Sequence, residues 1–250
     1  FSCEGTDEEK SSMCESGCIE STMEEMIKGP DVDLVVAATV VVDALNLAVT
    51  ALSARKNLAL ANKESVVMAG ELLTDIAKRN GIEILPIDSE PNAIWQCLRG
   101  EGNSVSKLIL TASGGAFRDF TPDALASVTP EQALNHPTWS MGARITVDSA
   151  TLMNKAFEVI EAHWLFGIPW DNIDVVIHPQ SIIHSMVEFV DGSLKAQLGT
   201  HDMRIPISYA LTYPERQEAV ANRMDLGSLA NLHFHEPDHT RFPLLDAAIT

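Results

Sequence analysis

Apolar runs alternate with amphipathic stretches through the first third of the chain. Residues 32–40, 58–61 and 82–87 are dominated by aliphatic side chains, as in strands that are buried on both faces. Between them, residues 44–54 and 65–79 carry apolar positions at helical spacing. This order of strand, helix, strand, helix, strand predicts a parallel sheet of the α/β class.

The second half of the chain has a different pattern. Short apolar or alternating runs predict further strands, at residues 107–111, 173–177, 185–190 and 194–198. A long helix is predicted at residues 150–166, with Gly167 as its stop signal. Asp191-Gly192 is a favoured two-residue hairpin turn, so we expect antiparallel pairing around it. The fold class is therefore α/β, with a parallel sheet followed by an α+β part that contains antiparallel strands.

Composition excludes several classes of partner. The 250 residues are 46% hydrophobic, which is enough to fill a core. A net charge of −18 argues against nucleic acid, because that binding depends on clustered Lys and Arg. The longest apolar run, residues 34–42, is far shorter than the roughly 20 residues of a membrane span.

Cysteine usage favours a cytoplasmic protein. Four cysteines are present in the sequence, Cys3, Cys14, Cys18 and Cys97. Reduced thiols are the favoured interpretation, and a disulfide or a zinc site is the alternative.

Acidic residues follow the predicted strand at 82–87. Asp88 and Glu90 flank Ser89, and a turn at Ser89 would let both carboxylates hold one ion. Oxygen ligands without His or Cys select Mg²⁺ or Mn²⁺, and Glu158 could be the third ligand. The other interpretation of such an acid pair is a helix cap.

Polar residues on the predicted helix at 150–166 suggest an anion site. Asn154, Lys155 and Glu158 lie on neighbouring parts of one face because they are three or four residues apart. Free N–H groups and the partial positive charge of a helix start, with Ser149 beside the cap, favour a phosphate. The alternative is a solvent-exposed Lys–Glu pair without function.

Two loops could complete a site. Ala112-Ser113-Gly114-Gly115 permits close approach of a ligand to the backbone. Residues 136–144, which include Trp139, are either a lid that closes over substrate or a surface loop whose Trp docks on the core. Among the histidines we favour His136 as a substrate contact, His178 as a supporting residue and His163 as structural.

These motifs together resemble the 1-deoxy-D-xylulose 5-phosphate reductoisomerase family. The blocks that carry the resemblance are residues 61–65, 88–90, 112–115, 136–142, 148–161 and 177–186. The resemblance implies an NADPH- and divalent-cation-dependent oxidoreductase of the non-mevalonate isoprenoid pathway. It would convert 1-deoxy-D-xylulose 5-phosphate to 2-C-methyl-D-erythritol 4-phosphate by a metal-assisted rearrangement and a hydride reduction. A cytoplasmic homodimer is implied as well.

The resemblance also implies residue roles. The cation ligands, counted as catalytic together with Lys63, would be Asp88, Glu90 and Glu158. The sugar-phosphate contacts would be Lys63, Ser89, Glu90, Ser113, His136, Ser149, Asn154, Lys155 and Glu158. The NADPH contacts would be Asn62, Glu64, Met141 and Gly142, and the flap would include Trp139 and Met141.

The resemblance divides the chain into three parts. Residues 1–87 would be part of an NADPH-binding domain, residues 88–212 a catalytic domain with its flap at 136–144, and residues 213–250 a linker and the start of a C-terminal region. The sequence contains no glycine-rich dinucleotide loop, and it starts at Phe1. We expect a piece of a longer protein that alone binds NADPH weakly. NADPH titration of the 250-residue chain tests this, and micromolar affinity would contradict it.

Two departures from the family pattern bear on the site. Pro91 stands where the family often has His, which removes a possible donor near the cation, and residues 39–43 are bulkier than the small, Gly-rich family pattern. Two other functions compete with the reductoisomerase. One is a metal-dependent sugar-phosphate isomerase or aldolase without a redox step, and the other is a non-catalytic binding module. Substrate-dependent oxidation of NADPH separates them.

Overall fold

The computed structural model describes residues 22–39, 41–102, 104–138, 140–219, 221–229 and 231–247. Two compact units make up the chain, Phe1–Leu85 and Pro86–Thr250. Trp139 and the cysteines at 3, 14 and 18 lie outside the described residues, whereas Cys97 is a buried free thiol. Among the residues described, none of the helices is both long enough and apolar enough to cross a membrane.

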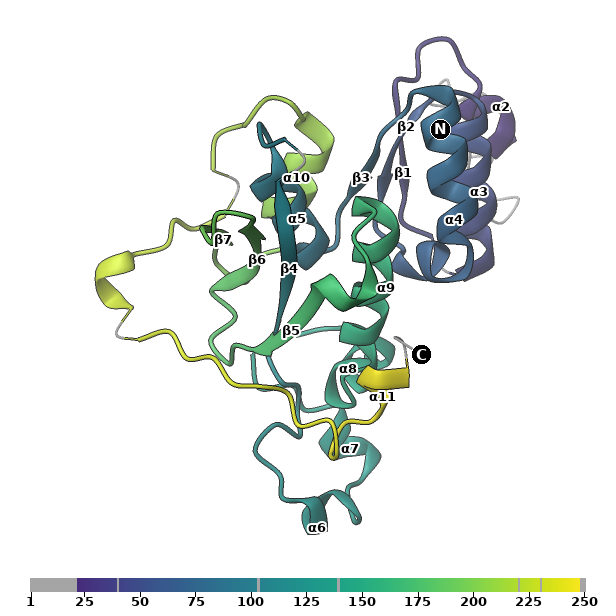
Figure 1. Ribbon diagram of the computed structural model, residues 1–250. Helices are drawn as coiled ribbons and strands as arrows, with labels where there is room; N and C mark the ends of the chain where they lie inside the picture. The colour runs from purple at the N-terminus through teal and green to yellow at the C-terminus, as the bar shows by residue number, and fades with distance from the viewer. Residues whose placement is uncertain are drawn as a thin grey trace. The chain divides into compact units, whose positions relative to one another are not determined.

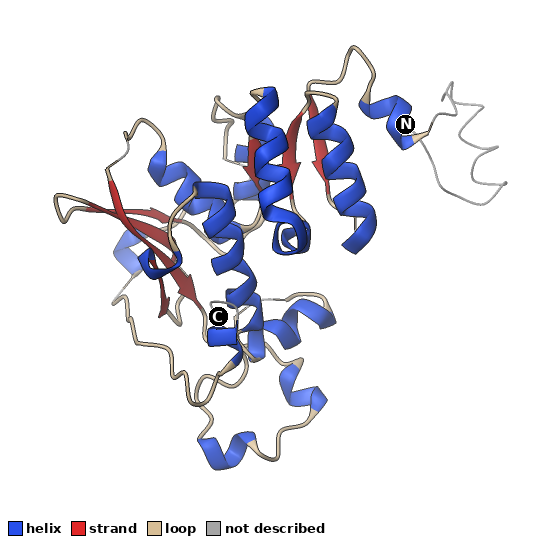
Figure 2. Ribbon diagram, turned by 45° about the vertical axis from the view of Figure 1, so that its right-hand side comes forward, coloured by secondary structure: helices blue, strands red, loops and turns tan. Residues whose placement is uncertain are grey.

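The first unit has the predicted order of strands and helices. Its elements are α2 (Met23–Ile27), β1 (Leu34–Ala37), α3 (Val41–Ser53), β2 (Asn57–Leu60), α4 (Lys63–Asn80) and β3 (Ile84–Pro86), whose last residue, Pro86, is the first residue of the second unit. Strands β1 and β2 pair in parallel, and β2 lies between β1 and β3, so the predicted parallel sheet is confirmed. Helix α3 packs against β1 and β2, and α4 packs beside α3 (Figure 2).

Local signals fix both ends of α4. The Asn62 side chain accepts a hydrogen bond from the Ser65 N–H at 3.0 Å, which satisfies a donor that the first turn leaves unpaired. At the other end, Gly81 adopts a φ of 68°, the left-handed conformation that ends many helices.

The second unit combines a mixed sheet with helices. Its elements are α5 (Ser89–Leu98), β4 (Val105–Ala112), α6 (Pro122–Leu125), α7 (Pro130–Ala133), α8 (Ala143–Ala150), α9 (Met153–Phe166), the 3₁₀ turn η1 (Trp170–Asn172), β5 (Ile173–Ile177), β6 (Ile183–Phe189), β7 (Leu194–Leu198), α10 (Arg204–Thr212), the 3₁₀ turn η2 (Leu226–Ser228) and α11 (Leu244–Ala247).

The sheet of the second unit has the order β5-β4-β6-β7 (Figure 1). Strands β4 and β5 are parallel, whereas β6 pairs in antiparallel fashion with β4 and β7, which confirms the predicted change of pattern. The prediction of a two-residue turn at Asp191-Gly192 was wrong. The ladder ends at Glu188 and Leu194, and Phe189 N–H bonds to Ser193 O at 2.9 Å, so residues 190–193 form the connection.

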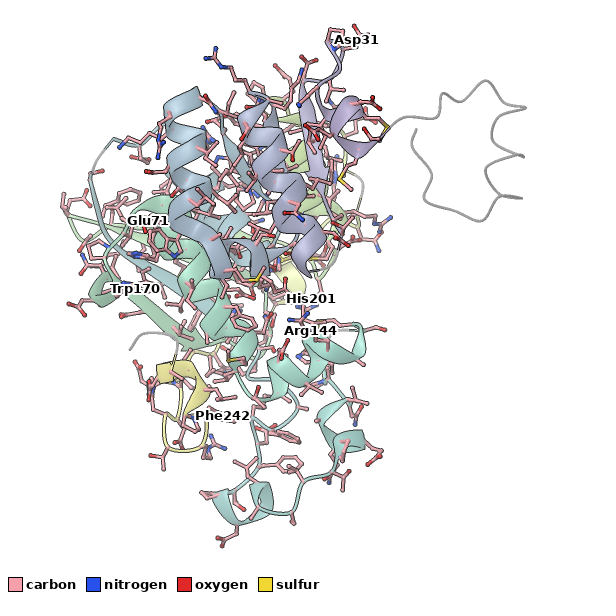
Figure 3. All side chains as sticks on the ribbon, turned by 90° about the vertical axis from the view of Figure 1, so that its right-hand side faces the viewer. Asp31, Glu71, Arg144, Trp170, His201 and Phe242 are labelled. Carbon is pink, nitrogen blue, oxygen red and sulfur yellow. The ribbon has the colours of Figure 1, made fainter. Side chains whose placement is uncertain are left out.

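Helices α5 and α9 lie side by side on the sheet. Helix α5 packs against β6 and β7, α9 packs against β4 and β5, and the two helices also contact each other. Leu108 and Leu110 of β4 are fully buried beneath them. Phe242, labelled in Figure 3, joins this core just before α11, which packs against α9. The start of α5 and the first half of α9 are thereby held on a common rigid support.

The helix predicted at residues 150–166 is confirmed from Met153 to Phe166, with Gly167 at its end, but its predicted start at Ala150 was wrong. Helix α8 ends at Ala150, and Thr151 closes it through its N–H and hydroxyl, which both bond to Val147 O at 3.2 Å. Leu152 then adopts a φ of 59° and starts α9 in a new direction. A left-handed residue cannot continue an α-helix, so Ser149 lies in the last turn of α8 and does not cap α9.

Candidate functional site

A cavity of about 230 Å³ lies beside the start of α5 and the first half of α9, entirely within the second unit. Ten of the predicted site residues line it: Asp88, Ser89, Glu90, Ser113, His136, Met141, Ser149, Asn154, Lys155 and Glu158. They come from α5, α8, α9 and the loops after β4 and α7. The tertiary structure thus brings most of the predicted residues into one place.

Three carboxylates converge in this cavity. Asp88, Glu90 and Glu158 each offer an oxygen, and the three oxygens lie within 4.8 Å of one another. The turn at Ser89 that would let both carboxylates hold one ion is present as the first turn of α5, and Asp88 caps it by accepting the Ser89 N–H at 3.0 Å. Asp88 is therefore both a helix cap and a member of the carboxylate cluster, so the two interpretations of the acid pair are compatible.

Pro91 fits this first turn of α5 without the loss of a helical hydrogen bond. It is the third residue of α5, where the backbone N–H has no partner inside the helix. The ring fixes φ near the helical value, so the turn that carries Asp88 and Glu90 is stiffened.

Lys155 offsets part of the negative charge of the cluster. Its ammonium donates to Glu90 Oε1 at 2.8 Å and also to a carboxylate oxygen of Glu158. Lys155 and Glu158 are only 4% and 1% exposed, so the alternative of a solvent-exposed pair was wrong. Burial by itself lowers the pKa of Lys155, but the charges of Glu158 and Glu90 outweigh it and raise that pKa overall. The side chain is therefore a buried cation.

Hydrogen-bonding side chains also line the cavity from the loops that follow β4 and α7. His136 Nδ1 accepts the Thr138 N–H at 3.1 Å, so the neutral ring carries its proton on Nε2, which lies 3.0 Å from Ser113 Oγ. Ser113 Oγ also accepts the Gly115 N–H at 3.2 Å, which leaves the hydroxyl hydrogen able to point at a ligand. Burial, and next the charge of Arg118, lower the pKa of His136 and keep the ring neutral.

The loop after β4 touches the end of α8. Gly115 has a φ of 68°, and a Cβ placed on it would lie 2.3 Å from Ser149 O. Only glycine permits this approach, which sets Ser113 beside Ser149. With Asn154 and Lys155 of α9, these hydroxyl, amide and ammonium donors suit an anion such as a phosphate ester.

Several lining residues were not predicted from the sequence. They are Thr111, Ser140, Ile145, Leu152, Ser181, His184 and Met203. Ser140, Ser181 and His184 fall within blocks that resemble the family, which was the available signal. Met203 precedes α10, and nothing in its local sequence marks it.

Other predicted residues are not among those that line the cavity. Asn62, Lys63 and Glu64 lie in the first unit at the start of α4, where Asn62 is the N-cap and Lys63 is 8% exposed. Gly142 is the N-cap residue of α8. Trp139 lies outside the described residues. The roles predicted for these residues stay predictions.

Two histidines have structural hydrogen bonds. His178 is fully buried; its Nδ1 lies 2.8 Å from His233 O, and its Nε2 accepts the Ile182 N–H at 3.1 Å. His163 Nδ1 lies 2.7 Å from Ile168 O, and its ring stacks on Trp170. These contacts agree with the supporting and structural roles expected of them.

We expect stability to fall between pH 7 and pH 5 because of His184. Burial, and next the charge of His201, lower the pKa of His184 to about 4, whereas a histidine in the unfolded chain titrates near 6.5. The unfolded state therefore takes up the proton first, and stability present above pH 6.5 is lost as the pH falls toward 4. Urea unfolding of the full-length protein should show a loss of about 2 kcal/mol at pH 5.

His184→Gln should remove most of this pH dependence, and His235→Gln, at an exposed position, should retain it. An equally steep loss in His184→Gln would refute the assignment.

Family models of one enzyme match most of the chain. The description "1-deoxy-D-xylulose 5-phosphate reductoisomerase" matches residues 4–70. The C-terminal domain models of the same family match residues 84–166 and 198–250.

Curated relatives carry the same description. A 1-deoxy-D-xylulose 5-phosphate reductoisomerase of Heliobacterium modesticaldum is 56% identical over 221 residues, which are 88% of this chain and 56% of the relative. A second, from Bacillus cereus, is 53% identical over 220 residues, 88% of this chain and 57% of the relative. The chain thus spans little more than half the length of the curated relatives it matches.

Solved structures of the family superpose on the chain. A crystal structure of DOX-P reductoisomerase in complex with NADPH, fosmidomycin and magnesium has a TM-score of 0.90 and 43% identity, and the match covers 99% of this chain and 65% of that one. The enzyme from Zymomonas mobilis in complex with NADPH gives a TM-score of 0.84 and 43% identity, with 91% and 59% covered. Agreement in sequence, in fold and in the order of the motifs leads to one conclusion: this chain belongs to the 1-deoxy-D-xylulose 5-phosphate reductoisomerase family.

Proposed function

We propose that the protein is an NADPH-dependent reductoisomerase that converts 1-deoxy-D-xylulose 5-phosphate to 2-C-methyl-D-erythritol 4-phosphate. The observation that carries the proposal is the single cavity in which three carboxylate oxygens within 4.8 Å of one another adjoin a set of anion-binding donors. Such a cavity suits a sugar phosphate whose hydroxyl and carbonyl oxygens meet a cation at one end and whose phosphate meets donors at the other.

Asp88, Glu90 and Glu158 fit a divalent cation. Their oxygens are hard ligands from three side chains, and within the described residues this is the cluster whose oxygens could share one ion. Mg²⁺ or Mn²⁺ is the expected occupant, and magnesium is present in the related complex with fosmidomycin. A cation held there polarises the substrate carbonyl and stabilises negative charge that develops on oxygen.

The remaining lining residues bind and orient the substrate. Ser113, Ser149 and Asn154 would donate to the phosphate, with the Lys155 ammonium as the counter-charge, because charge-assisted hydrogen bonds are the strongest available. Holding the phosphate fixes the distance from it to the cation site, and this presents the reacting carbons in one orientation. His136, neutral at pH 7, and Ser89 would contact sugar hydroxyls.

NADPH would supply the hydride for the reduction. The related crystal structures that contain NADPH support this cofactor. Asn62 and Glu64 at the start of α4, together with Met141 and Gly142, are the proposed contacts, and Lys63 the proposed catalytic residue beside them. Residues 136–144, with Trp139, would close over the substrate and exclude water, which protects the intermediate from side reactions.

The test is an assay of the full-length protein with 1-deoxy-D-xylulose 5-phosphate, NADPH and Mn²⁺. NADPH consumption that requires both the substrate and the cation is the expected result. Conversion of the sugar phosphate without NADPH consumption would favour the rival isomerase or aldolase. Binding of the sugar phosphate without turnover and without a need for metal would favour a binding module.

The cytoplasmic location, the homodimer and the division of the chain at residues 87 and 212 remain proposals as well. Size measurement of the full-length protein in solution, as a dimer or a monomer, tests the assembly.

A further inference from the structure

Asn92 is a buried polar residue in the first half of α5 whose amide is fully engaged. It is 1% exposed and is not one of the residues that line the 230 Å³ cavity. Its Nδ2 donates to Pro86 O at 2.7 Å and to Pro206 O at 3.3 Å, and its Oδ1 accepts from Gln96 Nε2 at 2.7 Å. Both amide hydrogens and the amide oxygen therefore have partners.

Hydrogen bonds of Asn92 lie at both ends of the short segment that leads to Asp88 and Glu90. Pro86 is the last residue of β3, and Asp88 caps α5 two residues later. The side chain of Asn92 holds the carbonyl of Pro86, while its backbone N–H donates to the carbonyl of Asp88 at 2.9 Å. One residue thus fixes both ends of the short turn from which Asp88 and Glu90 project.

A second set of contacts joins this turn to α10. Pro206 lies in the first turn of α10, three residues after Met203, which lines the cavity. Gln96 Oε1 accepts from Arg216 Nη2 at 2.8 Å, and the Arg216 guanidinium lies 4.6 Å from the centre of the Tyr209 ring on α10. The end of β3, the start of α5 and α10 are therefore tied through one asparagine.

We propose that Asn92 is a positioning residue of the cation site, which sets the Asp88–Glu90 turn against Glu158 without contacting the cation. This inference rests on the proposed function. Asparagine is the side chain that supplies two donors to two carbonyls and one acceptor to an amide; aspartate would oppose both carbonyls with oxygen. Outer hydrogen bonds that orient metal ligands commonly change metal affinity by roughly 10- to 100-fold.

The experiment measures Mn²⁺ affinity of the full-length protein by calorimetry, with Asn92→Asp and Asn92→Ala against the wild type. We expect the dissociation constant for Mn²⁺ to rise about tenfold or more in both variants. Inorganic phosphate binding, measured without metal, should change less than about threefold, because Ser113 and Ser149 come from other elements. Asn80→Ala, which removes an asparagine bond to Leu52 O in the first unit, is the matched control and should leave Mn²⁺ affinity unchanged.

Selective loss of Mn²⁺ affinity supports positioning. Unchanged Mn²⁺ affinity in both variants overturns it, and so does a parallel fall of Mn²⁺ affinity, phosphate affinity and melting temperature, since that result means a purely structural role. If neither variant folds, Gln96→Leu decides, because it removes the partner that orients the Asn92 amide: weaker Mn²⁺ binding supports the inference and unchanged binding overturns it. A wild-type protein that binds no Mn²⁺ would instead overturn the proposed function, and the inference with it.

Discussion

Glu158→Gln is expected to abolish tight cation binding and turnover in the full-length protein. The substitution keeps the shape of the side chain but removes one of the three carboxylate charges proposed to hold the cation. We expect Mn²⁺ affinity to fall by roughly a hundredfold or more. Turnover with 1-deoxy-D-xylulose 5-phosphate and NADPH should fall by a similar or larger factor, because the proposed cation would stabilise charge in the transition state. Calorimetry with Mn²⁺ and the rate of NADPH oxidation measure the two effects.

The control for this variant is Glu188→Gln. It makes the same change of charge on β6 at a residue that does not line the cavity, so metal affinity and turnover should be retained. Treatment of the wild type with a chelator should reproduce the loss of turnover, and added Mn²⁺ should restore it. A Glu158→Gln protein that binds Mn²⁺ as tightly as the wild type would remove Glu158 from the cation site.

Gly115→Ala is expected to damage both stability and phosphate binding. The new Cβ would have to share space with backbone atoms of Ser149 and Ala150, the nearest at 2.3 Å, and the residue would keep a φ of 68°. Backbone atoms cannot rotate away as a flexible side chain can. Left-handed strain and overpacking together should lower the free energy of unfolding by roughly 3 kcal/mol or more. Displacement of Ser149 should raise the KM for the sugar phosphate about tenfold.

Gly167→Ala separates the effect of left-handed strain from the effect of the clash with Ser149. Gly167 has a φ of 65° in the same unit, but a Cβ placed on it meets nothing within 4 Å. This variant should therefore suffer only the left-handed strain, which lowers its free energy of unfolding by about 1–2 kcal/mol, and it should retain its KM. Urea unfolding and steady-state kinetics of both variants give the comparison. Equal effects of the two substitutions would mean that the contact with Ser149 has no consequence for the site.

Elements with strong local patterns were predicted well. The strand at residues 173–177 was predicted to the residue, and the apolar run at 58–61 gave β2 within one residue. Such runs are buried whatever their neighbours are, and their ends are set by adjacent polar and turn-forming residues. The order of elements along the chain then limits the topology, since strands joined by helices pair in parallel.

The break between α8 and α9 could not be read from the sequence. Neither Gly nor Pro occurs there, and Leu152 is a residue type that seldom adopts a positive φ. The Leu152 side chain is 2% exposed, and burial in the core of the second unit supports the strained backbone. Tertiary packing outweighed helix propensity at this point, and it moved Ser149 from a helix start to a helix end.

The candidate site likewise contains residues that the sequence predicted and residues that only the fold brings together. Asp88, Ser89 and Glu90 are adjacent, and Asn154, Lys155 and Glu158 share a helical face, so short spacing was enough to select them. His184 on β6 and Met203 before α10 enter the same cavity only because β6 and α10 both pack against α5. No spacing rule spans such distances along a chain.

Residue order alone therefore gave the class of fold, the two clusters of polar side chains and the family, because these depend on local periodicity and on short motifs. Three-dimensional packing decided that the clusters meet: α5 and α9 lie side by side on one sheet, and this brings carboxylates 68 residues apart, at positions 90 and 158, within reach of one ion. Burial then excluded water from Lys155 and Glu158, which turned an ordinary helical ion pair into a buried charge cluster.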